Sequence, residues 1–357
     1  MNSVLGLYLR PGSFSDRWVE YCREKGIPFK PVDPFRPDFV QQAERLKAFA
    51  WHWAHDDPRA VLMARQVTFA LETKGLAVYP NSATCWHFDD KVGQKYLLEA
   101  IGAPLVPSYV FYDRESALQW IEHASFPKVF KLRRGAGSSN VRLVRSAADG
   151  RRLVARAFRT GFNPVAPYFS DWRAKLARSR QHGEPPDQKT QGETPRQETW
   201  LFGILRRLPR SIREIARVNR LLQKERGYVY FQDFIPANWF DTRVTVIGRR
   251  AFGCIRFARK GDFRASGSGH ADWNPKHVDM ACVQAAFTVT SRMGAQSLAF
   301  DFVLGPGRQP LIVEISYCCP PYSTFSCPGH WDEALTWHDG HIRPEDAILE
   351  DLIRSLP

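Results

Sequence analysis

Two neighbouring apolar segments each carry one acidic residue at the centre, and this pattern constrains the fold more than any other feature of the chain. The segment "LAFDFVL" (298–304) contains Asp301, and "LIVEISY" (311–317) contains Glu314. Both segments have the length and composition of buried β-strands, in which an unpaired carboxylate costs several kcal/mol. Because neither segment contains Lys or Arg, the partners of both carboxylates must come from another part of the fold or from solution.

The loop between these segments, "GPGRQP", is typical of a β-hairpin, so we expect the two carboxylates to meet across an antiparallel strand pair. The two-residue period of a strand places Asp301 on the face opposite to four large apolar side chains: Leu298, Phe300, Phe302 and Leu304. In the second segment the same period places Glu314 and Ser316 on one face with Ile312. Two or three oxygen ligands on adjacent strands suit Mg²⁺, whereas a salt bridge to a distant arginine is the structural alternative.

Composition narrows the class of protein. The 357 residues are 44% apolar and 24% charged, as in ordinary globular proteins, and their number suggests two or three subdomains. No run of ~20 apolar residues occurs, so we expect no membrane span. The N-terminus lacks a basic leader with a small-residue cleavage site, and the seven cysteines follow no disulfide-framework spacing. We therefore expect a cytoplasmic protein in a reducing compartment.

The positive charge of the chain is concentrated in one segment. The formal net charge is +13, and residues 161–226 contain 14 Lys and Arg against 7 Asp and Glu. We interpret this segment, which includes the least hydrophobic stretch of the chain, as a basic insertion ending in a basic helix. Such a helix suits nucleic acid or an anionic surface, but no zinc-finger spacing, RNA-binding aromatic signature or basic zipper accompanies it. We therefore favour a solvated lid or a collar for an anionic substrate over nucleic acid.

The first part of the chain alternates strand and helix patterns. The segments "VLGLYL", "PFKPV" and "LAVYP" are strand-like and indicate an α/β layer with a parallel sheet. Between the second and third of them we expect one long helical region, residues 39–75, that ends at Gly75. A short helix follows in "DDKVGQKYLLEAIGAP", where Asp89 or Asp90 is placed to cap the start and Gly102 to stop the end.

Two lysines are candidates for binding phosphate. Lys91 opens the short capped helix, and Lys131 ends the strand "KVFK" just before a Gly/Ser loop. Backbone N–H groups in such a loop can cradle phosphate, and a lysine on a strand adds a fixed positive charge. Taken alone, Lys91 is more often an ordinary surface lysine. A Gly/Ser loop taken alone is more often an ordinary turn.

The region after the basic insertion offers further candidates. The segment around Asp233 suits a planar base, because it combines backbone hydrogen-bonding groups with an apolar wall. Asp241 and Arg243 share one face of the next strand, a pattern that more often marks an ion pair than a ligand site. Arg256 and Arg264 belong to a basic cluster that suits carboxylate or phosphate, with a solvated basic hairpin as the alternative.

Five segments in the same order resemble the ATP-grasp superfamily over about residues 89–317. They are "DDKVGQKYLLEAIGAPLVP", "FPKVFKLRRGAGSSNV", "VYFQDFIPANWFDTRVTVIG", "RKGDFRASG" and the pair "DFVL…LIVEISY". The chain is most similar to the carboxylate–amine ligases of this superfamily, such as glutathione synthetases and the glutamate ligases that modify ribosomal protein tails. The resemblance implies an α/β (α+β) fold in five parts: an N-terminal α/β pre-ATP-grasp domain (1–88), a central and lid subdomain (89–160), the basic insertion (161–226), a mostly antiparallel C-terminal ATP-grasp subdomain with the Mg-ATP site (227–330) and a C-terminal cap (331–357).

The resemblance also implies a role for each matching residue. Lys91 and Lys131 would contact the ATP phosphates, beneath a lid loop formed by Gly135, Ala136, Gly137 and Ser138. Adenine would lie against a hinge formed by Asp233, Phe234 and Ile235, with Asp241 near the ribose. Arg256 and Arg264 would be catalytic, facing the transferred phosphoryl group and the substrate carboxylate. Asp301 and Glu314 would hold Mg²⁺, or Mn²⁺ as an alternative. The family usually has Asn two residues after the metal-binding Glu, where this chain has Ser316, a weaker ligand.

The activity that the resemblance implies is that of an ADP-forming ligase. ATP would convert a carboxylate into an acyl phosphate, and an amine or another nucleophile would attack it. The carboxylate would belong to an anionic small molecule, a polymer or a peptide, in keeping with the positive charge of the chain. A phosphotransferase (kinase) and a nucleotide-binding regulator without turnover are the alternatives on the same scaffold. The sequence leaves the oligomeric state open.

Overall fold

The structure is a computed structural model that describes residues 5–55, 57–135, 140–163, 223–259, 261–265 and 268–356. It has two compact units, one made of Met1–Ser108 and Ile235–Pro357 and the other of Tyr109–Phe234. Most of the predicted basic insertion and three predicted lid residues (Ala136, Gly137 and Ser138) lie outside the described residues. Within the described ranges, no helix combines the length and apolar character that crossing a membrane requires.

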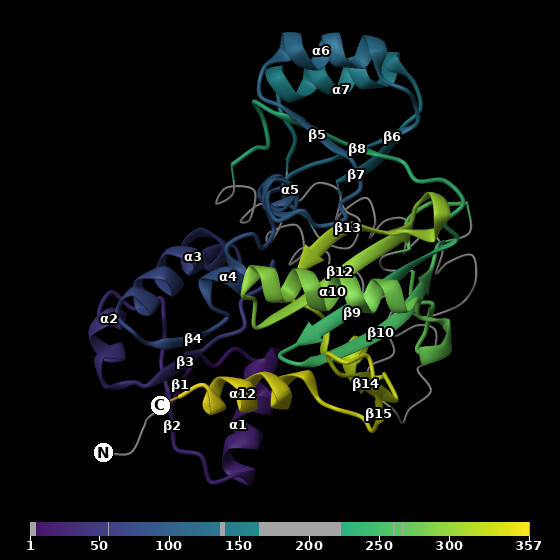
Figure 1. Cartoon of the computed structure of the whole chain (residues 1–357). Coiled ribbons are helices and arrows are strands. Elements are labelled where there is room, and N and C mark those ends of the chain that lie inside the picture. The colour runs from purple at the N-terminus through teal and green to yellow at the C-terminus, as the bar shows by residue number, and fades with distance from the viewer. Residues whose placement is uncertain are drawn as a thin grey trace, which may run out of the picture. The chain divides into compact units, whose positions relative to one another are not determined.

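A four-stranded parallel sheet opens the first unit (Figure 1), with the strand order β2-β1-β3-β4. Its strands are β1 (Leu5–Leu7), β2 (Phe29–Pro31), β3 (Ala48–Ala50) and β4 (Ala77–Tyr79). The helical segments between and after them are α1 (Phe14–Glu24), α2 (Phe39–Gln42), the 3₁₀ turn η1 (Ala43–Arg45), α3 (Pro58–Thr73) and α4 (Ser82–Cys85). The predicted α/β layer with a parallel sheet is confirmed.

The predicted helix over residues 39–75 is wrong in its first half. Only α3 is a long helix there, and it begins after Asp57, whose carboxylate accepts a hydrogen bond from the Arg59 N–H (3.1 Å). Gly75, with a φ of +83°, follows the end of this helix as predicted. Residues 48–50 form the inner strand β3 instead, and all three are fully buried. A strand buried on both faces is a continuous apolar run, which periodicity cannot distinguish from a buried helix.

The second sheet of this unit is antiparallel and contains both acidic segments. Its order is β13-β12-β9-β10-β14-β15, with β11 paired to β10. The strands are β9 (Phe240–Ile247), β10 (Arg250–Phe257), β11 (Ala271–Asp272), β12 (Ser297–Leu304), β13 (Pro310–Ser316), β14 (Gly329–Trp331) and β15 (Trp337–Asp339). Short helical turns lie at η2 (Pro275–His277), η3 (Pro306–Arg308) and α11 (Pro321–Phe325).

Two cores stabilise the first unit. Helix α10 (Met280–Met293) covers one face of the antiparallel sheet (Figure 1), and its Val283 and Ala286 belong to the same buried cluster as Phe300 and Phe302 of β12. The last helix, α12 (Pro344–Arg354), shares a second buried cluster with α1 and the parallel sheet. Because α12 completes the core of the N-terminal sheet, the chain ends are part of one folded unit.

Helix α5 (Lys91–Ala100) also belongs to the first unit. Of the two predicted caps, Asp90 is the one that accepts a hydrogen bond from the Gly93 N–H (2.9 Å). Gly102 has a φ of +64° after the helix end, as its stop signal predicts.

In the second unit the described residues form a four-stranded sheet and two helices, and the order of the sheet is β5-β8-β6-β7. The strands are β5 (Ser108–Phe111), β6 (Lys128–Lys131), β7 (Val141–Val144) and β8 (Val229–Asp233). Helices α6 (Arg114–His123) and α7 (Ala147–Arg159) lie side by side on this sheet (Figure 1) and form a buried cluster with Phe130 and Phe231.

Candidate active site

Asp301 and Glu314 are direct neighbours across the β12–β13 pair, as the hairpin pattern predicts. The register of this pair shifts between Asp301 and Phe302, so that Phe302 lies opposite Ile312. The prediction that Ile312 shares a face with Glu314 is therefore wrong. The irregularity turns Ile312 into the core beneath α10, where it is fully buried with Ile315. A β-bulge inserts one extra residue into a strand and so breaks its two-residue period.

Glu314 is paired with Lys91. The ammonium Nζ lies 2.9 Å from Glu314 Oε1, and the Lys91 side chain is 4% exposed whereas that of Glu314 is 32% exposed. The interpretation of Lys91 as a surface lysine is therefore wrong. Asp90 caps the start of α5, which packs against β13, and the first helical residue places its ammonium beside the strand. An ammonium and a partly open carboxylate at this distance can bind a phosphate and a divalent cation side by side.

Asp301 is neutralised by two arginines, one from the neighbouring strand β9 and one from β10 beyond it. Arg243 lies directly opposite Asp301 on β9 and donates from Nε to Oδ1 (2.8 Å) and from Nη2 to Oδ2 (3.0 Å). Arg256 Nη2 on β10 lies 2.9 Å from Asp301 Oδ2. Burial alone would raise the pKa of Asp301, but the two guanidinium groups outweigh it and hold this pKa below its ordinary value.

Arg256 extends the ion-pair network to Asp241. The two residues face each other across β9 and β10, and Arg256 Nε donates to Asp241 Oδ1 at 2.7 Å. We name the six residues of this network the charged cluster: Lys91, Glu314, Asp301, Arg243, Arg256 and Asp241. Three are cations and three are anions, so the cluster is balanced when all are ionised. Five of the six were predicted as site residues. The sixth, Arg243, was predicted only as a member of an ion pair.

The donor set of the cluster fits a metal ion that arrives with a nucleotide. A carboxylate has about four acceptor positions, and the three guanidinium donors named above leave one of them on Asp301. Within the described ranges, no three His, Cys, Asp or Glu residues gather as a ready-made metal cage. Mg²⁺ commonly takes only one or two carboxylates together with substrate phosphates. The pair of Glu314 and Asp301 therefore suits Mg²⁺ bound to phosphate more than a structural metal.

Ser316 is engaged in a tight turn rather than directed at a carboxylate. Its hydroxyl donates to the Cys318 carbonyl (3.1 Å) and accepts from the Cys318 N–H (3.2 Å). The thiol of Cys318 in turn lies 3.3 Å from Nε2 of the buried His52. The predicted role of Ser316 as a metal ligand stays a prediction, and this turn competes with it for the hydroxyl.

Arg264 lies apart from the charged cluster. It lies in the loop between β10 and β11 and pairs with Asp262, with Nη2 and Oδ2 2.7 Å apart. Arg259 N–H also donates to the Arg264 carbonyl (3.4 Å). Arg264 therefore belongs to a local loop arrangement, and the predicted role for it stays a prediction.

The second unit holds all but one of the remaining predicted residues that the structure describes, and Ile235 begins the returning part of the first unit. Lys131 is the last residue of β6 and is 3% exposed, opposite Tyr230 of β8. Asp233 is opposite Lys128, and Lys128 Nζ lies 2.6 Å from Asp233 Oδ1. Lys128 was not among the predicted site residues, although it lies in the predicted strand "KVFK", two residues before Phe130.

The other second-unit positions lie at loop ends. Gly135 has a φ of +124°, a backbone conformation that favours glycine. Phe234, directly after β8, ends the second unit, and Ile235 begins the returning part of the first; both are partly buried.

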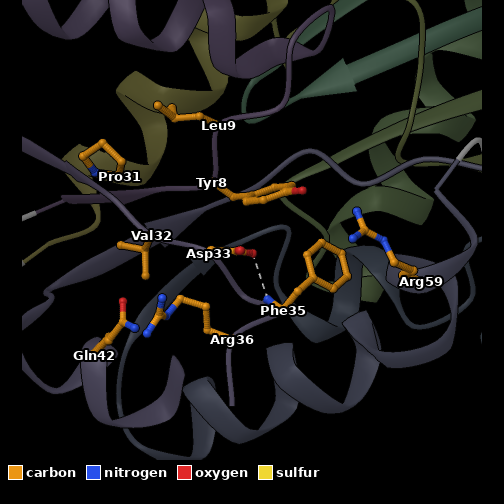
Figure 2. A pocket seen from close by; sticks show the side chains of 9 residues that line it. All are labelled: Tyr8, Leu9, Pro31, Val32, Asp33, Phe35, Arg36, Gln42 and Arg59. Carbon is orange, nitrogen blue, oxygen red and sulfur yellow. Dashed lines mark hydrogen bonds between the residues drawn. The ribbon is translucent and has the colours of Figure 1, made fainter. Parts of the chain in front are cut away.

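A separate pocket of about 500 Å³ lies in the first unit, beyond the carboxyl ends of β1 and β2 (Figure 2). The rings of Tyr8 and Phe35 and the guanidinium groups of Arg36 and Arg59 line it. Asp33 adds a carboxylate that accepts a hydrogen bond from the Phe35 N–H (3.0 Å). Open α/β sheets commonly bind ligands at the carboxyl ends of their strands. The pocket offers charges of both signs and aromatic walls to a small ligand.

Solved structures similar to this one cover nearly the whole chain. The RimK domain ATP-grasp protein from Sphaerobacter thermophilus DSM 20745 matches with a TM-score of 0.53 and 16% identity, over 99% of this chain and 100% of that one. The D-alanine–D-alanine ligase from Bacillus anthracis, complexed with ATP, matches with a TM-score of 0.51 and 12% identity, over 99% of this chain and 98% of that one.

A third similar structure contains a metal-bound nucleotide. It is the biotin carboxylase domain of the Hydrogenobacter thermophilus 2-oxoglutarate carboxylase, in complex with MgADP, ADP and bicarbonate. It matches with a TM-score of 0.54 and 12% identity, over 97% of this chain and 68% of that one. No family model matches the sequence, and no curated protein matches it. At these identities the likeness shows the fold, and the predicted fold is confirmed.

Proposed function

We propose that this chain, which has the ATP-grasp fold, is an ATP- and Mg²⁺-dependent, ADP-forming ligase that joins a carboxylate to an amine. The observation that carries the proposal is the charged cluster, in which Lys91, Glu314 and Asp301 come together from three elements of that fold. Similar solved structures include a ligase complexed with ATP and a carboxylase domain complexed with MgADP, which supports nucleotide and metal in general terms.

The proposed roles follow from charge and exposure. Lys91 would bind a phosphate oxygen, because its ammonium is held within reach of a partly open carboxylate. Glu314 and Asp301 would hold Mg²⁺, which would draw charge from the phosphate oxygens when bound. Arg256, which lies against both Asp301 and Asp241, would face the transferred phosphoryl group. Lys131, Asp233 and Phe234 of the second unit would contribute nucleotide contacts together with Ile235, and Gly135 would be the start of the lid loop.

The proposed reaction has two steps. A substrate carboxylate oxygen attacks the γ-phosphorus of ATP, so that the new O–P bond replaces the bond to the β-phosphate oxygen and ADP leaves. The amine nitrogen then attacks the acyl carbon, the C–N bond forms, the C–O bond to phosphate breaks and inorganic phosphate leaves with a proton lost from the amine. Fixed positive charge from Lys91 and Arg256 would stabilise the migrating phosphoryl group, because it carries negative charge throughout.

The pocket of Figure 2 is our proposed site for the substrate that carries the carboxylate. Arg59 lies over the Phe35 ring at 4.2 Å, so its guanidinium plane is oriented by the pocket wall. Its present carboxylate partner is Asp57, at 3.3 Å from Nε. Arginine suits bidentate carboxylate binding, so Arg59→Ala would raise the KM for the carboxylate substrate more than it would lower kcat.

The test of the proposed function is ADP release in the presence of Mg²⁺ across a panel of carboxylates, each with and without an amine mixture. We expect release that needs both substrates and is lost in Asp301→Ala and in Glu314→Ala. Release with a carboxylate alone, with a stable phosphorylated product, would replace the ligase by a kinase. Binding of Mg-ATP without release for any pair would replace it by a nucleotide-binding regulator.

A further inference from the structure

Gln94 makes a two-point contact with the strand that carries Glu314. Its Nε2 donates to the Ile315 carbonyl (2.8 Å), and its Oε1 accepts from the Ile315 N–H (3.3 Å). The same Nε2 lies 3.2 Å from the His87 carbonyl oxygen. Gln94 is 4% exposed and lies three residues after Lys91 on α5, while Ile315 directly follows Glu314 on β13.

This contact replaces a missing strand neighbour. β13 is at the end of the sheet order, so the described residues place no further strand of this sheet along one of its edges. A carboxamide carries the same donor and acceptor as a peptide group, so Gln94 satisfies both backbone groups of Ile315 as a strand would. Further along β13, the segment after α5 pairs with the same edge, where Ile312 N–H donates to the Pro104 carbonyl and Val106 N–H to the Ile312 carbonyl.

We propose that Gln94 is a positioning residue that holds the Lys91 ammonium at Glu314. Residues three apart on a helix lie on the same side, so fixing Gln94 on Ile315 also fixes Lys91 beside Glu314. A lysine side chain loses rotamer freedom when it is held in one geometry, and this loss offsets the gain from an ordinary ion pair. The Gln94 contact reduces this cost because it aligns the helix with the strand before the ligand arrives. The inference rests on the proposed function for its consequence in catalysis.

A matched control distinguishes a purely structural role of Gln94 from the proposed positioning role. Gln296 makes the same kind of contact elsewhere in the first unit: its Nε2 donates to the Val78 carbonyl (2.9 Å) and its Oε1 accepts from the Asn81 N–H (2.8 Å). Gln94→Met loses three hydrogen bonds to backbone and Gln296→Met loses two, both at nearly constant side-chain length. Of these two glutamines, Gln94 is the one that connects the helix of Lys91 to the strand of Glu314.

Two readouts in the full chain test the proposal. The first is the rate at which the Lys91 amine is acetylated, followed by peptide mass spectrometry without any nucleotide. The second is the Kd for Mg-ATP from calorimetry. We expect Gln94→Met to raise the acetylation rate of Lys91 and to weaken Mg-ATP binding by about 10- to 100-fold, the range for residues that orient ligands. Gln296→Met should leave both near the wild-type values.

The outcomes distinguish the two proposals. Wild-type Lys91 reactivity in Gln94→Met, or an equal change in Gln296→Met, would overturn the positioning role. If wild-type protein does not bind Mg-ATP, the proposed function fails, while the acetylation rates still decide the role of Gln94. If Gln94→Met does not fold, Gln94→Asn serves in its place, because it keeps an uncharged carboxamide but shortens its reach by one methylene group.

Discussion

Asp301 and Glu314 are cross-strand neighbours, yet their carboxylates are neutralised from different elements of the fold. Asp301 is held by Arg243 and Arg256 within the sheet, and its side chain is 13% exposed. Glu314 is held by Lys91 from α5 and is more open, at 32%. The two carboxylates therefore have different roles in the proposed site. Glu314 would be the accessible metal ligand, whereas Asp301 would also stabilise the sheet.

The arginine pairs of Asp301 predict a large effect on stability. Asp301→Asn removes the negative charge between two mostly buried guanidinium groups, and breaking such a pair costs about 3–5 kcal/mol of unfolding free energy. Glu333→Gln removes the partner of Arg249 in an exposed pair and should change stability by less than ~1 kcal/mol. Urea unfolding at pH 7 measures both. Equal, small changes would show that Asp301 is not the anchor of these arginines.

Substitution of the buried Lys91 should weaken nucleotide binding without unfolding the protein. Lys91→Met removes a charged hydrogen bond to phosphate, worth about 1.5–3 kcal/mol, so the Kd for Mg-ATP should rise by about 10- to 100-fold. Lys95→Met is the matched control, because Lys95 lies on the same helix and pairs with Glu99 instead. Calorimetric titration with Mg-ATP gives both values. Similar affinities in the two variants would contradict the role of Lys91.

Substitutions of Ser316, whose hydroxyl is engaged in the turn with Cys318, should change the Mg²⁺ dependence of ADP release. Ser316→Asn supplies an amide oxygen on a longer side chain and should lower the Mg²⁺ concentration for half-maximal ADP release, whereas Ser316→Ala should raise it. Ser323→Ala, which removes a hydroxyl bound to the Pro320 carbonyl, should leave the Mg²⁺ dependence unchanged. If neither Ser316 variant shifts the Mg²⁺ titration, the hydroxyl serves the Cys318 turn alone.

Buried histidines predict that acid destabilises the chain. Burial lowers the pKa of His87 to about 3, below its ordinary value near 6.5. Between these values the unfolded state binds the proton and the folded state does not, so stability falls as the pH falls through this window. The slope is ~1.4 kcal/mol per pH unit, which amounts to a loss of roughly 2 kcal/mol from pH 7 to pH 5.

His87→Gln tests this slope. Urea unfolding at pH 7 and pH 5 should show a smaller difference in this variant than in the wild-type protein. His123→Gln, at an exposed position at the end of α6, should keep the wild-type difference. An unchanged pH dependence in His87→Gln would mean that this histidine is not kept neutral by the fold.

The strongest sequence signals were those in which one residue violates its local pattern. A carboxylate in an apolar strand is such a signal, and it correctly placed Asp301 opposite Glu314. Helix caps were equally readable, because Asp90 and Gly102 act through their own side chain or backbone over a few residues. These features depend on local chemistry, which one sequence contains in full.

The features that the sequence did not reveal depend on tertiary contacts. Strand β3 is apolar on both faces, so it was indistinguishable from a helix. The register shift beside Asp301 depends on how β13 packs beneath α10, and no residue type marks it. The burial of Lys91 and the role of Arg243 follow from which elements become neighbours across the sheet. A lone lysine or an Asp–Thr–Arg segment does not show which elements become its neighbours in the fold.

Binding of Mg-ATP by calorimetry, in wild-type protein and in Glu314→Gln, is the most direct measurement of the central claim. Glu314→Gln keeps the side-chain shape and removes the charge that pairs with Lys91 and would hold the metal. The account predicts binding by the wild type that depends on Mg²⁺, and loss of that Mg²⁺ dependence in the variant. Absence of Mg-ATP binding by folded wild-type protein, or identical Mg²⁺-dependent binding by both proteins, would contradict it.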